Sequence, residues 1–410
     1  MRLCGEITVP GDKSITHRAI ILAAIAEGES EIIGWLPSED CRHTLNAVKA
    51  MGVEVLEREN VLQVKGCGLS SLKEPEDVID CGNSGTTLRL LTGLLAGQNF
   101  VSFLTGDDSL RKRPMCRVVD PLREMGAEIT GRFNDTLAPL SIKGRNISAI
   151  AYTLPVASAQ VKSAILLASL YASGETVITD PFGTRNHTEL MFKYFGAGKQ
   201  GFKGRTTNVP DDFSSAAFFI VAGLIIPDSV ITIKNVGINR TRTGLLDVLK
   251  KMGANIEISA TDTQIDCYEP IANITIHTSN LKGAGIVEGE IIPRLIDEFP
   301  ILCIAAAAAD GETLIRGAKE LRVKESDRIA TMAKALRVIG VPVEELEDGI
   351  RIEGRERWGG GMCETQKDHR VAMAMRIASL RKDGVIRPDD ESCINTSFPG
   401  FNHLLDSLIK

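Results

Sequence analysis

The sequence predicts an α/β fold of the α+β type, built from repeated βαβαββ units whose helices gather in the core. Three observations support this prediction. A helix, a glycine and a β-rich strand recur in the same order at five places along the chain. The contents of hydrophobic residues, 43%, and of charged residues, 24%, are typical of globular proteins. With 410 residues, the chain is long enough for two or three domains with full cores.

Each copy of the repeat ends its helix at a glycine, which readily adopts the left-handed conformation of a helix C-cap. Successive glycines are 74, 70, 57 and 87 residues apart. A unit of about 70 residues suits a compact subdomain and is too long for a solenoid repeat. Because the third interval is short and the segment 196–209 is polar, we predict that one subdomain has lost a strand pair there. The glycines are Gly52, Gly126, Gly196, Gly253 and Gly340.

Composition narrows the classes of function. The net charge of −6 argues against a dedicated nucleic-acid binder and leaves small acidic ligands as the expected partners of local basic clusters. Nine scattered cysteines without a CxxC pair predict neither a zinc site nor a disulfide framework. The apolar runs at 216–226 and 299–309 are too short to span a bilayer, and residues 1–6 lack an apolar signal core. We therefore expect a cytoplasmic protein without a membrane segment.

The first candidate anion site precedes an apolar helix expected at 19–26. Asp12 or Ser14 can cap this helix, and Lys13 and Arg18 flank the cap. A helix N-terminus offers unpaired N–H groups and a partial positive charge, to which these side chains add donors. The segment predicts a phosphate or carboxylate site; the alternative is an ordinary capped helix with solvated basic residues.

Two more candidates precede helices in the same half of the chain. CGNSGTTLR at 81–89 contains Asn83 and Gly85, and its small residues let the backbone approach a ligand. It is not a P-loop, because no Gly-Lys-Ser/Thr follows. The cations around Arg113 precede a proline that starts a helix, which suggests a second anion contact. The alternatives are a solvated basic turn there and, for SEDCRH at 38–43, a capping box with surface charges.

Polar side chains also begin the next two helices. Ser158 and Gln160 precede a helix expected at 164–171, and their side chains are suited to bind hydroxyls and a phosphate oxygen. RNHTE at 185–189 follows a turn. Simple helix capping would also explain either motif.

Carboxylates join the cations in the second half of the chain. Asp297 and Glu298 lie immediately before an apolar helix, where capping explains one of them and the other is a candidate general base. In the motif RVKESDR, Lys324, Glu325 and Arg328 can share one helix face. That arrangement suits a proton donor held among phosphate ligands, although a solvated face is the ordinary interpretation.

Basic and carboxylate side chains thus gather at helix N-termini in both halves, and Asp-His-Arg at 368–370 opens a further apolar helix at 371–380. If two helix-cored domains face each other, these termini converge on one set of anionic ligands. This pattern predicts an enzyme that acts on phosphorylated, carboxylated substrates.

The motifs resemble those of the 3-phosphoshikimate 1-carboxyvinyltransferase (EPSP synthase) family, and the resemblance covers essentially the whole chain. It implies an inside-out α/β barrel of two domains, each with three βαβαββ repeats and helices at the core. We expect domain 1 at 11–209 with its third repeat shortened, domain 2 at 1–10 plus 210–410, and the active site in the cleft between them. The matching motifs, in family order, are GDKSITHRA, SEDCRH, CGNSGTTLR, KRP, SAQVKSA, TRNHTE, VPDDFSSAAFF, IDEFP, LRVKESDR and DHRVAMA.

The resemblance also implies a reaction and its partners. Phosphoenolpyruvate and shikimate 3-phosphate would give EPSP and phosphate, in the shikimate pathway to chorismate and the aromatic amino acids. Neither a metal nor an organic cofactor is implied. We expect a monomer whose partners are these two small molecules, with no nucleic acid and no membrane.

Roles for individual residues follow from the same resemblance. Asp297 is expected to accept the proton of the attacking 5-hydroxyl, and Glu325 with Lys13 to transfer a proton at the methylene carbon; His369 completes the expected catalytic set. The expected ligands of shikimate 3-phosphate are Lys13, Ser14, Arg18, Ser158, Ala159, Gln160, Thr184, Arg185, Asp297 and Lys324. The expected ligands of phosphoenolpyruvate are Lys13, Asn83, Gly85, Arg113, Gln160, Arg328, Arg370 and Thr396.

The chain departs from the family pattern in three places. Thr396 stands where the family often has a lysine that binds phosphoenolpyruvate, so one cationic contact is expected to be missing. Val-Pro-Asp-Asp at 209–212 replaces the usual Pro-Gly-Asp, which could stiffen a hinge. The shortened segment 196–209 is the third departure, and we expect its effect to be structural.

Two other functions were weighed against this one. The related transferase that acts on UDP-N-acetylglucosamine uses a cysteine ahead of an Arg-Pro, whereas Cys116 follows Arg113-Pro114 in this chain. A non-catalytic homologue that binds anionic ligands would agree with the missing lysine, but Lys13 and Glu325 argue against it. Because Gly85 leaves room for the inhibitor, we also expect sensitivity to glyphosate, which Thr396 could weaken.

Overall fold

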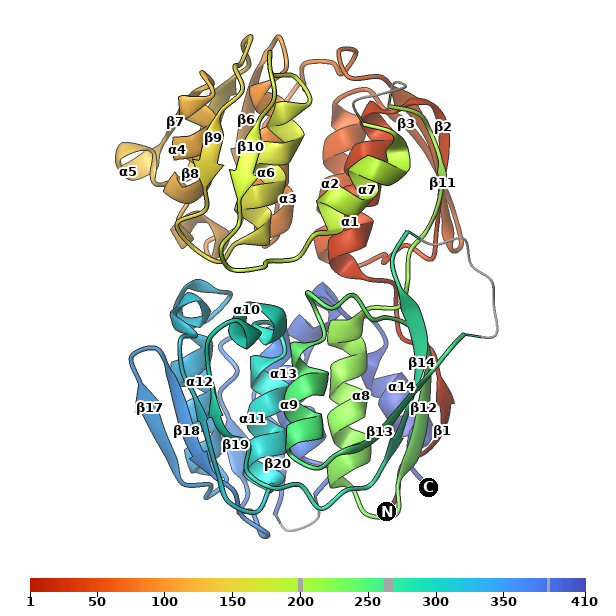
Figure 1. The fold of residues 1–410 in the computed structure, drawn as a ribbon, viewed down its shortest axis with the longest axis vertical. Coiled ribbons are helices and arrows are strands. Elements are labelled where there is room, and N and C mark those ends of the chain that lie inside the picture. The colour runs from red at the N-terminus through yellow and green to blue at the C-terminus, as the bar shows by residue number, and fades with distance from the viewer. Residues whose placement is uncertain (198–201, 262–267, 382–383) are drawn as a thin grey trace. The chain divides into compact units, whose positions relative to one another are not determined.

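The computed structural model describes residues 1–197, 202–261, 268–381 and 384–410, and the chain forms two compact units (Figure 1). The first unit comprises Gly11–Val209 and Ile265–Glu269. The second unit comprises Met1–Pro10, Pro210–Gln264 and Pro270–Lys410.

The first unit surrounds its helices with sheets of strand order β11-β2-β4-β3, β5-β6-β8-β7 and β10-β9 (Figure 1). Its elements are α1 Lys13–Ile25, β2 Glu27–Ile33, α2 Glu39–Ala50, β3 Glu54–Arg58, β4 Val61–Cys67, β5 Ile79–Asp80, α3 Gly85–Ala96, β6 Val101–Thr105, η1 Leu110–Lys112, α4 Cys116–Glu124, β7 Glu128–Gly131, α5 Arg132–Asp135, β8 Leu137–Lys143, β9 Ala151–Thr153, α6 Ala159–Ser169, β10 Val177–Thr179, α7 His187–Phe195 and β11 Thr206–Asn208.

The second unit has the same arrangement, with sheets of order β1-β12-β14-β13, β15-β16-β18-β17 and β19-β20. Its elements are β1 Cys4–Ile7, α8 Phe213–Ile225, β12 Val230–Gly237, α9 Gly244–Lys251, β13 Asn255–Ser259, β14 Ile271–His277, β15 Gly285–Val287, α10 Ile291–Leu295, α11 Phe299–Ala308, β16 Glu312–Ile315, η2 Lys319–Val323, α12 Arg328–Val338, β17 Val343–Leu346, β18 Gly349–Glu353, β19 Gly361–Cys363, α13 His369–Ala378, β20 Ile386–Pro388, η3 Ser392–Thr396 and α14 Phe401–Leu408.

The predicted βαβαββ repeat is clearest in the run β5-α3-β6-α4 followed by the hairpin of β7 and β8. In this repeat β5 and β6 are parallel, whereas β8 pairs antiparallel with both β6 and β7. The run from β15 to β18 has the same pairing. The predicted fold class is therefore confirmed.

The last repeat of each unit is reduced in the residues that the structure describes. Only β9 and β10 form the third sheet of the first unit, and only β19 and β20 form that of the second. A lost strand pair was predicted for 196–209 alone, and residues 198–201 of that segment lie outside the described residues. The reduction in the second unit was not predicted, because no short glycine interval marks it.

The five repeated glycines all have positive φ, between 77° and 104°, at or just after the ends of their helices. A side chain is strained in this conformation, whereas glycine adopts it freely. The predicted C-cap role of these glycines is thus confirmed.

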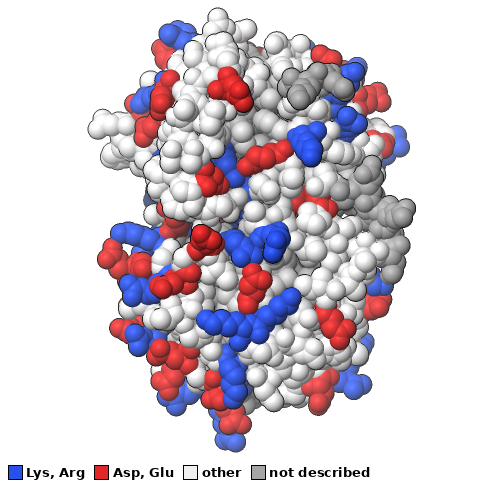
Figure 2. All heavy atoms as spheres, in the orientation of Figure 1, with Lys and Arg blue, Asp and Glu red and all other residues white. Residues whose placement is uncertain are grey.

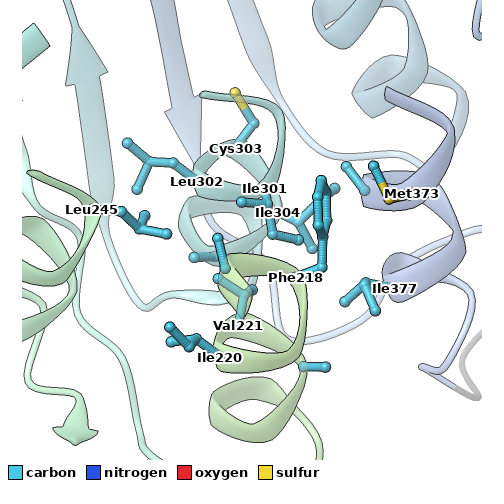
Figure 3. Close-up of a cluster of buried hydrophobic side chains, with 14 of the residues drawn as sticks. Phe218, Ile220, Val221, Leu245, Ile301, Leu302, Cys303, Ile304, Met373 and Ile377 are labelled. Carbon is cyan, nitrogen blue, oxygen red and sulfur yellow. The ribbon is translucent and has the colours of Figure 1, made fainter. Parts of the chain in front are cut away.

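Each unit places its most apolar helices inside. Figure 3 shows Phe218 of α8, Ile304 of α11 and Met373 of α13 in one buried cluster. A helix that is apolar on all sides must be covered on all sides, so α8 and α11 lie at the centre with sheets around them. Among the described residues, no helix is long and apolar enough to cross a membrane.

Several helices begin earlier than predicted. Helix α1 starts at Lys13, not residue 19, and α6 starts at Ala159, not residue 164. Asp12 and Ser158 are their N-caps, and each side chain accepts a backbone N–H three residues ahead. The predicted starts were wrong because the first polar turn of each helix was assigned to the preceding loop. The candidate ligands therefore lie in helical first turns.

Lysine and arginine side chains alternate with aspartate and glutamate over the face drawn in Figure 2. Charges of both signs are interspersed, with no broad field of one sign on this face.

The two segments where the chain passes between the units are bonded to each other within the second unit. The Asp211 carboxylate accepts the Val9 N–H at 3.0 Å, and the Asp212 N–H donates to the Pro10 carbonyl at 2.8 Å. Burial raises the pKa of Asp211 to about 7; the Val9 N–H acts against this shift, and the neighbouring Asp212 carboxylate adds to it.

This pKa predicts a pH dependence of stability. Because the folded-state pKa is above the unfolded value of 3.8, the contribution of Asp211 is complete below about pH 4 and is lost as pH rises to about 7. Asp211→Asn should therefore gain stability relative to the wild type across this window, by up to about 1.4 kcal/mol per pH unit. Urea unfolding at several pH values measures the gap. A constant gap would contradict the prediction, and Asp310→Asn, at an exposed carboxylate, is the control.

Candidate active site

The first turn of α1 carries the first group of predicted site residues. Lys13 Nζ lies 2.9 Å from Asp40 Oδ2, which comes from the first turn of α2. Arg18 bonds to three groups, donating to the Ser14 carbonyl, Thr188 Oγ1 and Ser163 Oγ at 2.7–2.8 Å. Helices α1, α6 and α7 thus hold one buried guanidinium in a fixed orientation.

The N-terminus of α3 brings the second group together. Arg113 Nη2 donates to Asn83 Oδ1 at 2.8 Å, beside Gly85 at the first position of the helix. Arg89, one turn into α3, donates to Gln160 Oε1 at 2.7 Å, and Gln160 donates in turn to Thr86 at 2.9 Å. The motifs at 81–89, 112–114 and 158–164 therefore meet.

A chain of buried hydroxyls joins the starts of these helices. His17 Nδ1 lies 2.7 Å from Thr44 Oγ1, which lies 2.7 Å from Thr87 Oγ1, and Thr87 bonds to Ser84, the N-cap of α3. Burial, together with nearby Lys13 and Arg18, holds the pKa of His17 well below its usual range. The imidazole is therefore neutral and links α1 to α2 and α3 without adding charge.

The remaining residues of the first unit lie at the starts of α6 and α7. Ser158 caps α6, Ala159 is its first residue, and both are half-buried. Arg185 lies two residues before α7, and Thr184 beside it is fixed through Asp180, whose Oδ2 accepts both its N–H and its hydroxyl.

The second unit gathers its charges around one arginine. Arg328 is 1% exposed and lies among three carboxylates. Its Nε is 2.8 Å from Asp368 Oδ2, its Nη2 is 2.6 Å from Glu325 Oε2, and its Nη1 is 3.5 Å from Asp297 Oδ1. Burial alone would lower the pKa of Arg328, but these carboxylates raise it instead, and Arg328 holds the pKa of buried Asp368 below its usual value. The guanidinium is permanently charged.

Two further predicted cations approach Asp297. Lys324 Nζ is 3.9 Å from Asp297 Oδ1, and Arg370 Nη2 is 3.9 Å from Oδ2. The neighbouring Glu298 instead bonds to Ser214 at 2.5 Å and lies 3.9 Å from Arg242. The structure thus separates the two adjacent carboxylates, one in the charged cluster and the other buried against α8.

His369 and Thr396 lie at the edges of this cluster. His369 is the first residue of α13 and is buried, next to Asp368, which caps the helix. Thr396 ends η3, which packs against α13, and its side chain is half-buried.

The turn before α13 is strained. Gln366 and Lys367 have φ of 53° and 58°, a left-handed conformation that disfavours side chains. Lys367 is exposed. Lys367→Gly should therefore raise the free energy of unfolding by about 1 kcal/mol, because glycine adopts this φ freely. Chemical denaturation measures the gain, and Lys367→Ala should show none. Destabilisation by glycine would contradict the assignment of strain.

Several residues of these clusters were not predicted as site residues. Asp40 was assigned to a capping box, and neither Arg89 nor Asp368 was singled out within its motif. One sequence feature could have indicated these residues: each is a charged residue next to an apolar helical run. A charged side chain that is buried there needs an oppositely charged or hydrogen-bonding partner. The partners themselves come from distant segments, which spacing along the sequence does not reveal.

Three comparisons with known proteins, by family model, by sequence and by structure, point to one family. The family model for EPSP synthase (3-phosphoshikimate 1-carboxyvinyltransferase) matches residues 1–405. The 3-phosphoshikimate 1-carboxyvinyltransferase of Pelobacter propionicus is 52% identical, covering 98% of this chain and 96% of its own, and that of Geobacter metallireducens is 53% identical with the same coverage. An EPSP synthase structure from Acinetobacter baumannii is 44% identical with a TM-score of 0.86, covering 99% of this chain and 96% of its own.

A more distant structure shows how far the fold extends. The enolpyruvyl transferase NikO from Streptomyces tendae has a TM-score of 0.77 over 99% of this chain and 95% of its own, with 15% identity, and shares the fold alone. The match of the family model over nearly the whole chain and the relatives at about half identity lead to one conclusion. This chain belongs to the EPSP synthase family.

Proposed function

We propose that this protein transfers the enolpyruvyl group of phosphoenolpyruvate to the 5-hydroxyl of shikimate 3-phosphate, giving EPSP and phosphate. The observation that carries the proposal is the concentration of cations and carboxylates at helix N-termini in each unit. Both substrates are polyanions, which such termini and guanidinium groups bind well. The relatives named above carry this activity in their names.

In this proposal the first unit supplies most of the ligands of shikimate 3-phosphate. Arg18 and Arg185 bind its phosphate, with the hydroxyls of Ser14, Ser158 and Thr184 as neutral donors. The start of α6, at Ala159 and Gln160, contributes backbone N–H and amide groups, and Lys13 contacts both substrates. The bonds that hold Arg18 fix its orientation before a ligand arrives, which reduces the entropy lost on binding.

Phosphoenolpyruvate is bound by guanidinium groups from both units. Arg113, Asn83 and Gly85 contribute from the α3 side, with Gln160 beside them. Arg328 and Arg370 contribute from the second unit, with Thr396 where relatives often place a lysine. Planar guanidinium groups match carboxylate and phosphate oxygens in pairs.

The chemistry then requires two proton transfers. Asp297 accepts the proton of the 5-hydroxyl while the hydroxyl oxygen bonds to C2 of phosphoenolpyruvate. Glu325 with Lys13 delivers a proton to C3, and the product of this addition is a tetrahedral intermediate. Phosphate leaves C2 and a proton leaves C3, which restores the enol double bond. Lys324 next to Asp297 and buried His369 next to Asp368 complete the charged surroundings.

Phosphate release by the purified protein tests the function. Shikimate 3-phosphate with phosphoenolpyruvate should release phosphate, and UDP-N-acetylglucosamine as acceptor should not. Release with neither acceptor would overturn the proposal in favour of an anion-binding homologue, and release with the nucleotide sugar alone would assign the other transferase activity.

A substitution at Gly85 tests the placement of phosphoenolpyruvate. A Cβ there would lie 2.6 Å from Arg89 Nη1 and 3.3 Å from Arg113 Nη1. Both are ends of flexible side chains, so Gly85→Ala should fold normally but displace the two guanidinium groups. We expect KM for phosphoenolpyruvate to rise about tenfold or more while KM for shikimate 3-phosphate stays within about twofold. Steady-state kinetics measures both, and an unchanged KM for phosphoenolpyruvate would contradict the placement.

The proposal also covers the oligomeric state, the cellular compartment and the inhibition of the protein. We propose that it acts as a monomer in the cytoplasm; the described cysteines are all free thiols, which agrees with a reducing compartment. Light scattering of the purified protein measures the oligomeric state. We also propose inhibition by glyphosate, because Gly85, unlike an alanine at this position, does not crowd the guanidinium groups of Arg89 and Arg113. Full turnover at millimolar glyphosate would reject this part.

A further inference from the structure

A buried pair of titratable side chains lies next to the proposed substrate ligands but in none of the roles assigned above. His187 Nδ1 is 2.5 Å from Glu269 Oε1, and the two side chains are 2% and 1% exposed. The residues are 82 positions apart in sequence. Among the described residues, His187 Nε2 has no hydrogen-bond partner, so Glu269 is the polar anchor of this imidazole.

Glu269 reaches this place from an unexpected part of the chain. It lies in the connection between β13 and β14, strands of the second unit, yet it belongs to the compact first unit. Tyr268 beside it packs on Tyr194 of α7, with ring centroids 5.1 Å apart. The connection therefore supplies both an aromatic contact and a carboxylate to the same helix.

The helix that receives Glu269 carries substrate ligands of the proposed reaction. His187 is the first residue of α7, and Arg185 lies two positions before it. Thr188, the next residue, accepts a hydrogen bond from Arg18 Nε at 2.7 Å and lies 2.7 Å from Ser163 Oγ. The start of α7 thus determines where Arg185 and Thr188 stand.

Helix α7 lacks the side-chain N-cap bond that other helices of this unit have. Asn186, the N-cap of α7, makes no side-chain capping bond, unlike Asp12 at α1, Ser84 at α3 and Ser158 at α6. The first turn of a helix has unpaired N–H groups and frays without a cap. The bond from His187 to Glu269 anchors this first turn, together with the bonds of Thr188 to Arg18 and Ser163.

We propose that Glu269 is a positioning residue for the shikimate 3-phosphate site: through His187 it holds the start of α7, and with it Arg185 and the Thr188 partner of Arg18. This inference rests on the proposed function for the identity of the ligand. Removal of the Glu269 carboxylate leaves the buried His187 imidazole without this hydrogen bond and leaves its surroundings free to shift.

Kinetics of Glu269→Ala and Glu269→Gln test the proposal. Glu269→Ala should raise KM for shikimate 3-phosphate about tenfold, with KM for phosphoenolpyruvate within about twofold. Glu269→Gln keeps an acceptor oxygen and should recover most of the loss. The double variant with His187→Ala should be no worse than His187→Ala alone, because both act through one bond. Glu257→Ala, which removes an exposed carboxylate 3.8 Å from His277, is the matched control and should change nothing.

Amide hydrogen exchange separates this inference from the proposed function. Exchange at 185–190 should be faster in Glu269→Ala than in the wild type, without any substrate, and unchanged in Glu257→Ala. If the variant exchanges faster but the wild type releases no phosphate, the anchoring role of Glu269 is supported and the assignment of shikimate 3-phosphate as the ligand is rejected. Unchanged exchange, or KM values for the two substrates that rise equally in an active enzyme, would overturn the inference.

Discussion

Replacement of Arg328 by methionine should destabilise the second unit by about 3–5 kcal/mol and abolish turnover. Methionine has a similar length but no charge, so buried Asp368 would lose the guanidinium that bonds to both of its oxygens. Asp368 would then either stay ionised without the Arg328 counterion or take up a proton. Both states are unfavourable at a buried site that is arranged for a charged pair. Glu325 and Asp297 would lose the same partner.

Denaturation of Arg328→Met beside the wild type measures this effect. Lys334→Met is the matched control, because Lys334 lies on the same helix and pairs with Glu364 at the surface. An exposed pair contributes at most about 1 kcal/mol. Equal losses in the two variants would show that Arg328 is not the centre of the charged cluster.

Glu325→Gln should leave the fold intact but lower kcat by about two to four orders of magnitude. Glutamine has nearly the same shape as glutamate and can still accept the hydrogen bond from Arg328. The side chain of residue 325 is 22% exposed, so an uncharged amide is tolerated there. It cannot carry the proton that the proposed mechanism moves to and from C3. Stability and catalysis should therefore separate at this position, in contrast to Arg328.

Single-turnover kinetics and a melting curve measure the two consequences. Glu347→Gln, which removes an exposed carboxylate paired with Lys319, is the control and should keep full activity. Normal kcat in Glu325→Gln would assign the proton transfer to another residue. A large loss of stability would mean that the residue is structural.

The sequence was informative wherever a functional residue lies close to a local signal. Turn residues, small residues and apolar runs indicated the presence of α1, α3, α6 and α13, although the starts of α1 and α6 were predicted too late. The glycines marked helix ends. From the residues alone, without the family resemblance, the choice between Asp297 and Glu298 as general base stayed open, because both precede the same helix. It depends on contacts with α8 and α12, far along the chain.

Long-range pairs lay beyond any sequence pattern. The carboxylate partners of Arg328 are three, 31 and 40 residues away, and Glu269 is 82 residues from His187. Nothing in the sequence around Glu269 indicates that this residue belongs to the first unit, since the flanking strands β13 and β14 lie in the second. Periodicity describes how a segment buries its face, but it does not state which distant segment covers that face.

The pairing of β1 with β12, on the far side of residues 11–209 in the sequence, has a consequence for synthesis on the ribosome. Strand β1 emerges before the first unit, yet it pairs with β12, and the Leu3 N–H donates to Ser229, 226 residues later. The 11–209 stretch can meanwhile collect nearly all of its own partners. Since domains generally fold as they emerge, the first unit should form before β12 is available to pair with β1. Closure of so long a loop is entropically costly and slow, which makes docking of the N-terminal strand a late event in folding.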